Sequence, residues 1–281
     1  MVLKAEGRTD MKEIIKKWYN ALDFSSKYNE QFYRILETEK LDSEMTIEQY
    51  DLNSQNGRKN FLMYLYFIEN LEKQYINRGI PQEIFYDTIQ DIVRWTDVWS
   101  EIKGELWLEE LVWLSFHLSF KLFKVGRLQF HMTTSGQDIP EYGILSKDCV
   151  LAVHIPPTEP FTPQKCEESF CNAEVFFEKY FPDFSYSYFT CRSWMLDDTL
   201  VKYLKPNSNI LQFQKNFMRI NRNESYNILK HVFKWDTRKE NLLDFESKTQ
   251  FAEQIKKAVL DGEKFYSTLG IKKRVNYVEN A

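Results

Sequence analysis

Three consecutive pieces of sequence decide the fold of this chain: CVLAVHI at 149–155, TPQKCEESFCNAEVFFEKY at 162–180 and YSYFTCRSWML at 186–196. The first piece is a nearly continuous apolar run rich in β-branched residues, which is typical of a buried strand. In the second piece, Thr162 is suited to cap a helix and Pro163 to occupy its first position. The third piece is strand-like again. Because strand, helix and strand in this order require a right-handed crossover, the two strands are predicted to be parallel neighbours.

Two more strands are predicted before this unit. Residues 127–132 alternate in polarity, and residues 142–145 follow a turn-rich segment that contains Gly136 and Pro140. Together with the strand at 149–155 they predict a three-stranded antiparallel meander. A meander followed by a helix and a parallel strand makes the second half of the chain a mixed α/β domain.

The chain after residue 196 is predicted to continue this domain with short elements. Asp197 or Asp198 has the residue type that caps a helix N-terminus. The predicted elements are a short helix that ends at Leu204, a strand over 209–217, and helices over 224–233 and 247–260.

The first part of the chain has helical periodicity. Apolar residues recur at helical spacing from Met11 to Leu22, and Gly79 and Pro81 have the positions of a helix end and a helix start. This part contains a single proline and hardly any alternating run, so five or six packed helices are predicted. The chain is therefore predicted to be α+β, with a helical domain at 1–122 and a mixed α/β domain at 123–281.

The composition is that of a globular protein large enough for a sizeable core. The chain has 281 residues, of which 43% are hydrophobic, 28% charged and 16% aromatic. Residues 1–121 carry 15 Lys and Arg against 21 Asp and Glu, whereas residues 122–281 carry 22 against 20. An acidic first half and a net charge of +2 in the second half argue against nucleic acid as a partner.

The cysteines and the hydropathy pattern predict the setting of the protein. All four cysteines lie in the second half and none forms a C-x-x-C pair, so no zinc site or other metal site is expected. Residues 1–10 have no leader pattern, and the apolar stretch 106–123 is interrupted by Glu109, Glu110 and His117. A cytoplasmic protein with no membrane partner is expected, while the sequence leaves the oligomeric state open.

The order of elements in the second half is that of a GNAT acyltransferase domain, and ordered sequence blocks support this. The chain resembles bacterial acyltransferase-like proteins in which an all-helical N-terminal domain precedes a GNAT-like C-terminal domain. This resemblance implies acyl transfer from coenzyme A to an unidentified acceptor, expected to be a small-molecule amine or a peptide. The blocks are GRLQF at 126–130, VHIP at 153–156, CRSWMLD at 191–197, and SNI at 208–210 with Phe213 and Phe217.

The loop that should hold the pyrophosphate of coenzyme A departs from the GNAT pattern. The resemblance implies the loop of typical GNAT enzymes, Arg/Gln-x-x-Gly-x-Gly/Ala, whose backbone N–H groups and helix N-terminus bind the phosphates. Here residues 156–163 contain four prolines and no glycine. Either other groups hold the phosphates or the domain has lost the cofactor. The candidate cofactor-binding residues are Ile155, Thr158, Thr162, Gln164 and Lys165.

The candidate catalytic residues are His154, Ser193 and Tyr203. His154 ends the strand beside the loop, where it would act as general base or would donate to the thioester oxygen. The resemblance implies that Tyr203 protonates the departing thiolate, and Ser193 lies on the following parallel strand. A sharper hypothesis pairs His154 with Cys191 as a nucleophile.

Two other functions compete with acyl transfer. The proline-filled loop favours a catalytically silent ligand-binding or scaffold protein that keeps the GNAT shape. A thioesterase that uses Cys191 or His154 is a third hypothesis. The sequence also leaves undecided whether the alternating polar row Arg127, Gln129 and His131 faces solvent or an acceptor pocket.

Overall fold

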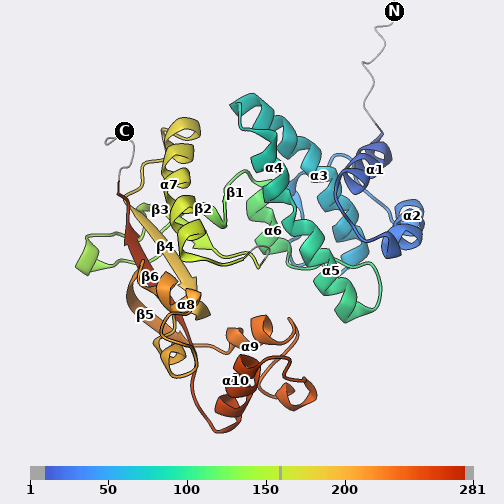
Figure 1. Ribbon diagram of the computed structural model, residues 1–281. Helices are drawn as coiled ribbons and strands as arrows, with labels where there is room; N and C mark the ends of the chain where they lie inside the picture. The colour runs from blue at the N-terminus through green and yellow to red at the C-terminus, as the bar shows by residue number, and fades with distance from the viewer. Residues whose placement is uncertain (1–9, 158–159, 276–281) are drawn as a thin grey trace, which may run out of the picture. The chain divides into compact units, whose positions relative to one another are not determined.

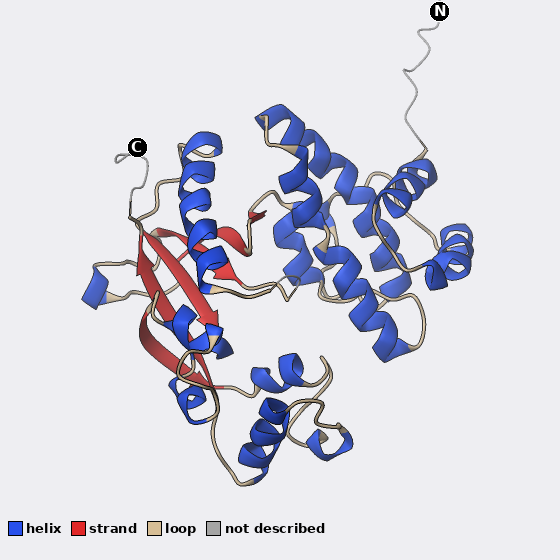
Figure 2. Ribbon diagram, in the orientation of Figure 1, coloured by secondary structure: helices blue, strands red, loops and turns tan. Residues whose placement is uncertain are grey.

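The computed structural model describes residues 10–157 and 160–275 (Figure 1). The chain divides into two compact units, Met1–Phe123 and Lys124–Ala281, which are described separately below. Figure 2 shows that the first is helical, whereas strands and helices mix in the second.

The first unit has six α-helices among its described residues, and residues 10–121 contain no strand, as the helical spacing predicted. The central one is α3, whose near-continuous apolar run from Phe61 to Ile68 is almost entirely buried. A helix that is apolar all round has to lie inside the bundle. The helices are α1 (Met11–Ala21), α2 (Asn29–Thr38), α3 (Gly57–Arg78), α4 (Gln82–Ile89), α5 (Asp91–Lys103) and α6 (Leu111–Leu118).

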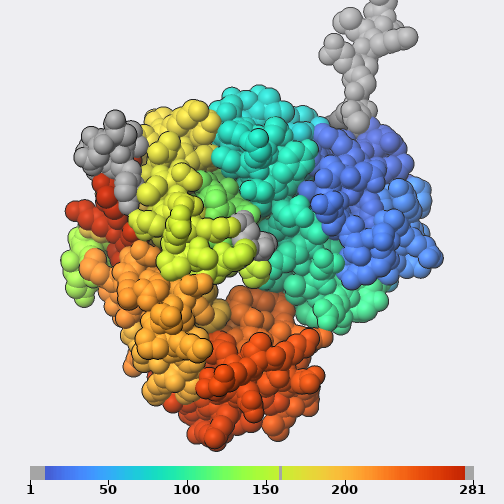
Figure 3. All heavy atoms as spheres, in the orientation of Figure 1, coloured from blue at the N-terminus to red at the C-terminus, as the bar shows by residue number. Residues whose placement is uncertain are grey.

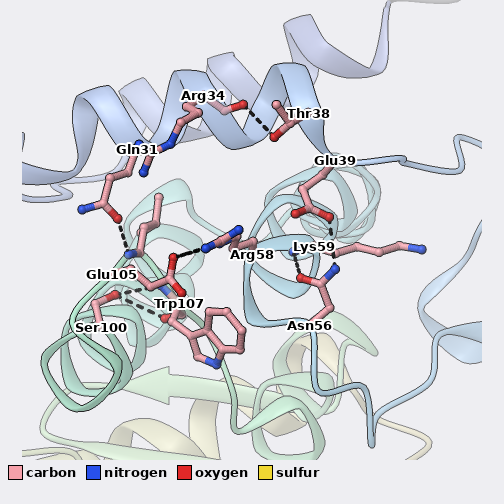
Figure 4. A network of polar contacts seen from close by, with 11 residues as sticks. Gln31, Arg34, Thr38, Glu39, Asn56, Arg58, Lys59, Ser100, Glu105 and Trp107 are labelled. Carbon is pink, nitrogen blue, oxygen red and sulfur yellow. Dashed lines mark hydrogen bonds and ion pairs between the residues drawn. The ribbon is translucent and has the colours of Figure 1, made fainter.

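A polar network ties the loop between α5 and α6 to the rest of the unit (Figure 4). Glu105 in this loop is ion-paired with Arg58 of α3. The backbone N–H of Leu106 donates to Gln31 Oε1 of α2 at 2.5 Å, and that of Trp107 donates to Ser100 Oγ of α5 at 3.0 Å. Three helices therefore hold the loop, and the indole of Trp107 is fixed against the start of α3.

Gly57 is the residue that this indole covers. A Cβ added to Gly57 would lie 2.3 Å from an indole ring atom of Trp107. Gly57→Ala is expected to destabilise the first unit by about 1–3 kcal/mol, because a fused ring held by backbone hydrogen bonds cannot move aside cheaply. Chemical denaturation followed by tryptophan fluorescence measures the effect. The same change in a Trp107→Leu background is expected to cost much less, and an equal cost in both backgrounds would contradict the clash.

The second unit is built on a six-stranded mixed sheet in the order β1-β2-β3-β4-β6-β5. β3 and β4 are parallel neighbours, as the strand–helix–strand pattern predicted, and α7 makes the crossover between them. The strands are β1 (Leu122–Val125), β2 (Leu128–Thr134), β3 (Cys149–His154), β4 (Tyr188–Ser193), β5 (Met218–Glu224) and β6 (Tyr266–Lys273). The helices are α7 (Pro163–Tyr180), α8 (Asn209–Gln214), α9 (Asn227–Val232) and α10 (Gln250–Leu260).

Two predicted strands are wrong. Residues 142–145 form no strand, because Pro140–Tyr142 is a 3-10 turn and Ile139 and Ile144 make only an isolated bridge. The meander is instead completed by β1, which lies at the end of an apolar stretch that resembled helix. Residues 209–217 begin as helix α8, since Ser208 Oγ accepts the Leu211 N–H at 3.3 Å as an N-cap. The strand β5 follows that helix, and β6 was not predicted at all.

The two faces of the sheet differ in character. α7 covers one face, where Phe170 packs on Phe130 and Phe189 with ring centroids 5.9 and 5.1 Å apart. Since alternate residues of a strand share a face, Cys191 lies on this side with Phe189. His154 lies on the other side, because the register places it opposite Gln129 and one position beyond Val153.

A long connection joins the antiparallel neighbours β5 and β6. Residues 225–265 carry α9 and α10 and have a small core of their own, centred on Leu229, Ile255 and Val259. In Figure 1 this segment extends from the end of the sheet at which β6 begins. It packs on the segment after β4 through Leu200.

Candidate active site where two parallel strands separate

β3 and β4 separate before either strand ends. In the part of the chain that the structure describes, their register comprises the pairs Leu151–Phe189 and Ala152–Thr190. β3 nevertheless stays paired with β2 as far as His154, and β4 stays paired with β6 as far as Ser193. The carboxyl ends of the two strands therefore diverge, and their facing backbone groups do not bond each other. Figure 3 shows the second unit hollowed between the yellow-green atoms that precede α7 and the orange atoms that follow β4.

α7 begins beside this divergence, and its first turn is capped by the chain itself. Thr162 is the N-cap, and its Oγ1 accepts the Lys165 N–H at 3.3 Å. The Gln164 side chain donates to Glu168 Oε1 at 2.9 Å, while the side chains of both Gln164 and Lys165 are exposed. Thr158 lies outside the described residues. An anion at this helix start would thus meet a capped first turn and the Lys165 ammonium.

The turn between β1 and β2 braces the start of α7. Ser169 Oγ accepts the backbone N–H of Arg127 at 2.7 Å and donates to the Lys165 carbonyl at 2.9 Å. A Cβ on Gly126 would lie 2.8 Å from that same oxygen, and Gly126 has a φ of +66°. Glycine is therefore required here by both conformation and space.

Arg127 has a buried position beside the start of α7, which the sequence pattern did not reveal. It is buried, and its guanidinium carbon lies 5.4 Å from the ring centroid of Phe161, which belongs to the loop after β3. The alternating row that it starts with Gln129 and His131 is buried as well, so these side chains do not face solvent. The sequence shows these three residues as an alternating polar row, but alternation alone does not tell whether a row is buried. Packing in the folded unit decides that.

The segment that follows β4 is held rigidly. Ser193 Oγ accepts the Met195 N–H at 3.1 Å, so this candidate catalytic hydroxyl serves as an N-cap. The buried Asp197 accepts from the Thr199 N–H at 3.0 Å and from the Tyr266 N–H at 2.8 Å. The carboxyl end of β4 is thereby fixed to the start of β6.

Tyr203 lies just beyond that segment and packs against the core of residues 225–265. Its hydroxyl donates to Glu263 Oε2 at 3.3 Å, and Lys202 is ion-paired with the same carboxylate at 3.0 Å. Partial burial, with the Glu263 charge, raises the pKa of Tyr203. The phenol therefore keeps its proton at neutral pH.

Cys191 does not pair with His154. The two side chains lie on opposite faces of the sheet, as the strand register requires. Burial also raises the pKa of the Cys191 thiol to about 12, so the thiolate needed for nucleophilic attack is disfavoured. The hypothesis of a thiol–imidazole pair is wrong.

Other functional features are limited in the described part of the chain. Across residues 10–157 and 160–275, no three His, Cys, Asp or Glu side chains gather in a way that could hold a metal ion. No helix in these ranges combines the length and the apolar character that spanning a bilayer requires.

Comparison with protein families assigns both parts of the chain. Residues 122–272 match the family described as GNAT-like C-terminal domain, and residues 3–120 match the N-acyltransferase N-terminal domain. No curated protein matches the chain.

Solved structures with a similar fold are acyltransferases. One, in complex with decanoyl-CoA and teicoplanin, has a TM-score of 0.68 and 22% identity over 78% of this chain and 67% of that chain. Another, in complex with decanoyl-CoA, has a TM-score of 0.66 and 23% identity over 76% and 65%. A third, in complex with CoA and 10C-teicoplanin, has a TM-score of 0.68 and 22% identity over 78% of this chain and 67% of that chain.

Proposed function

Because the chain belongs to the family of the GNAT-like C-terminal domain, which matches more than half of it, we propose that it transfers an acyl group from acyl-coenzyme A to an amine. The observation that carries this proposal is the separation of β3 and β4 next to the start of α7. Two parallel strands that diverge leave their facing edges open to an extended ligand. The pantetheine arm of coenzyme A, with its two amide groups, is such a ligand.

The proposed site places the cofactor along this opening. The pyrophosphate lies at the α7 N-terminus, where the helix dipole and the Lys165 ammonium favour an anion. Thr162 and Gln164 belong to this helix start, and the backbone of Ile155 is proposed to pair with the pantetheine arm. The thioester then lies near His154.

In the proposed reaction, His154 takes a proton from the acceptor ammonium or amine. The amine nitrogen attacks the thioester carbonyl, a C–N bond forms and the C–S bond breaks. The departing thiolate takes a proton from Tyr203, whose raised pKa keeps the phenol protonated until then. Ser193 lies at the edge of the opening, where its hydroxyl orients the acyl group. Holding the thioester and the amine together in a reactive orientation supplies most of the rate enhancement.

The acceptor is proposed to be an amine on a small molecule or a peptide. A structural relative is seen in complex with teicoplanin, so a glycopeptide is a suitable first acceptor to test. Isothermal calorimetry with decanoyl-CoA and CoA tests the cofactor half of the proposal. If neither compound binds, the cofactor half of the proposal is refuted.

The second candidate is a silent scaffold with the GNAT shape, and one observation favours it. The loop before α7 has no glycine, and the Lys165 N–H is already taken by Thr162 Oγ1. Thermal stabilisation separates the two functions, because a ligand at a hundred times its dissociation constant adds about 2.7 kcal/mol. The scaffold function predicts no shift with CoA.

Lys165→Glu is expected to weaken CoA binding about tenfold, because a carboxylate replaces the cation beside the pyrophosphate. Calorimetry measures the affinity. Lys179→Glu is the matched control, since Lys179 is exposed in the last turn of the same helix. Equal affinity of both variants for CoA would place the phosphates elsewhere.

A further inference from the structure

The opening between β3 and β4 has a polar side chain at the same level on each strand. The last pair in their described register is Ala152–Thr190, and His154 and Arg192 each lie two residues beyond it. Since alternate residues of a strand share a face, both lie on the face of Ala152 and Thr190. α7 packs on Phe189 and so covers the opposite face. His154 and Arg192 therefore flank the opening on the face that α7 leaves uncovered.

Arg192 is exposed, although the residues before it on β4 are buried. Phe189, Thr190 and Cys191 are at most 7% exposed. In the pairing of β4 with β6, Arg192 lies opposite Leu269, which is buried as well. An exposed arginine directly after this buried run shows where the face of the sheet becomes open to solvent. Its guanidinium is thus accessible to a ligand on the side of His154.

The chain supplies no described carboxylate to this guanidinium. No side-chain hydrogen bond or ion pair joins Arg192 to another described residue. The two carboxylates that follow β4 are engaged elsewhere. Asp197 accepts two backbone N–H groups, and Asp198 is ion-paired with Arg219 at 2.7 Å. An anion brought by a ligand would therefore meet an arginine that these two carboxylates do not neutralise.

The chemistry of this pair of side chains indicates what such a ligand carries. A guanidinium presents N–H groups in one plane, which match the two oxygens of a carboxylate. Neighbouring strands are about 5 Å apart, and two extended residues span at most about 7 Å. A molecule the size of a dipeptide therefore reaches from an amine beside His154 to a carboxylate beside Arg192.

We propose that Arg192 is a specificity-determining residue that binds a carboxylate of the acceptor while the acceptor amine lies at His154. The acceptor class is then a short peptide, or a similar amino acid derivative, in which the two groups are about two residues apart. This inference rests on the proposed acyl transfer at His154. The phosphates of CoA are not its ligand, because their proposed place is the N-terminus of α7, and α7 covers the other face.

The test compares two amines that differ only in the carboxylate, glycylglycine and glycylglycinamide. Their binding to the full chain is measured by saturation-transfer NMR, with and without CoA. The dipeptide is expected to bind about tenfold more tightly than its amide, the effect of one charge-assisted contact. Arg192→Gln is expected to remove this preference. Arg192→Lys is expected to keep part of it, because the ammonium retains the charge but not the planar fork.

Arg222→Gln is the matched control, since Arg222 is an exposed arginine of β5 in the same unit. It removes the same charge and should leave the preference intact. Circular dichroism checks the folding of each variant, and Arg192→Ala is a second replacement if Arg192→Gln does not fold.

Three results would overturn the inference. The unchanged protein could bind the two amines equally or bind neither, or the preference could survive Arg192→Gln. Calorimetry could also show that Arg192→Gln weakens CoA binding, which would assign Arg192 to the cofactor phosphates. The proposed function has its own readout: a preference for the dipeptide without any binding of CoA to the unchanged protein would support the carboxylate site and refute acyl transfer.

Discussion

Replacing His154 with alanine is expected to lower turnover about 10²- to 10⁴-fold, the usual contribution of a general base. CoA affinity is expected to remain close to that of the unchanged protein. The reason is that the proposed role of His154 exists in the transition state, whereas the proposed pyrophosphate and pantetheine contacts lie along β3 and α7. Removing it should therefore affect kcat and leave cofactor binding intact.

The measurement is release of free thiol from decanoyl-CoA with an amine acceptor, alongside calorimetry with CoA. Teicoplanin is the first acceptor to use, because a relative of similar fold binds it. His231→Ala is the control, since His231 is an exposed histidine of α9 in the same unit. Comparable turnover of the two variants would remove His154 from the chemistry.

Replacing Phe170 with alanine is expected to destabilise the second unit by about 3–5 kcal/mol. Phe170 is fully buried and packs on Phe130, Phe189 and Phe217 with ring centroids 5.1 to 6.0 Å away. The ammonium of Lys272, a residue of β6, lies 4.9 Å from the ring centroid of Phe170. One side chain thus joins α7 to three strands and to the residue before β5, and its loss leaves a cavity that the sheet cannot close.

Val175→Ala supplies the control on the same helix, because the Val175 side chain is half exposed. Its cost is expected to stay within about 0.5 kcal/mol. Urea denaturation followed by circular dichroism compares the two. If Phe170→Ala unfolds at the urea concentration of Val175→Ala, the packing of α7 on the sheet is weaker than the contacts indicate.

Elements governed by neighbouring residues were predicted correctly from the sequence. The helix over 163–180 begins where Thr162 and Pro163 indicate, because capping and proline geometry act within one turn. The parallel pairing of β3 and β4 followed from chain connectivity alone. The helical character of residues 11–118 followed from a long, consistent period.

Short segments with ambiguous periods were mispredicted. Residues 209–217 fit both a strand and a helix, and the Ser208 cap with the burial of Phe213 selected the helix. Residues 142–145 lacked a partner strand on which to form a ladder. In both cases the local sequence favours one conformation over the other by little free energy. Contacts with distant residues therefore decide which conformation forms.

For the site, the sequence by itself determined that a histidine ends a strand just before a helix that starts at Pro163. It did not determine the face on which that histidine lies. Strand register decided this, and one step of register moves every side chain to the other face. Only the register separated Cys191 from His154 and aligned Gln129 and His131 with it, because cross-strand neighbours are chosen by the pairing of distant segments and not by adjacency along the chain.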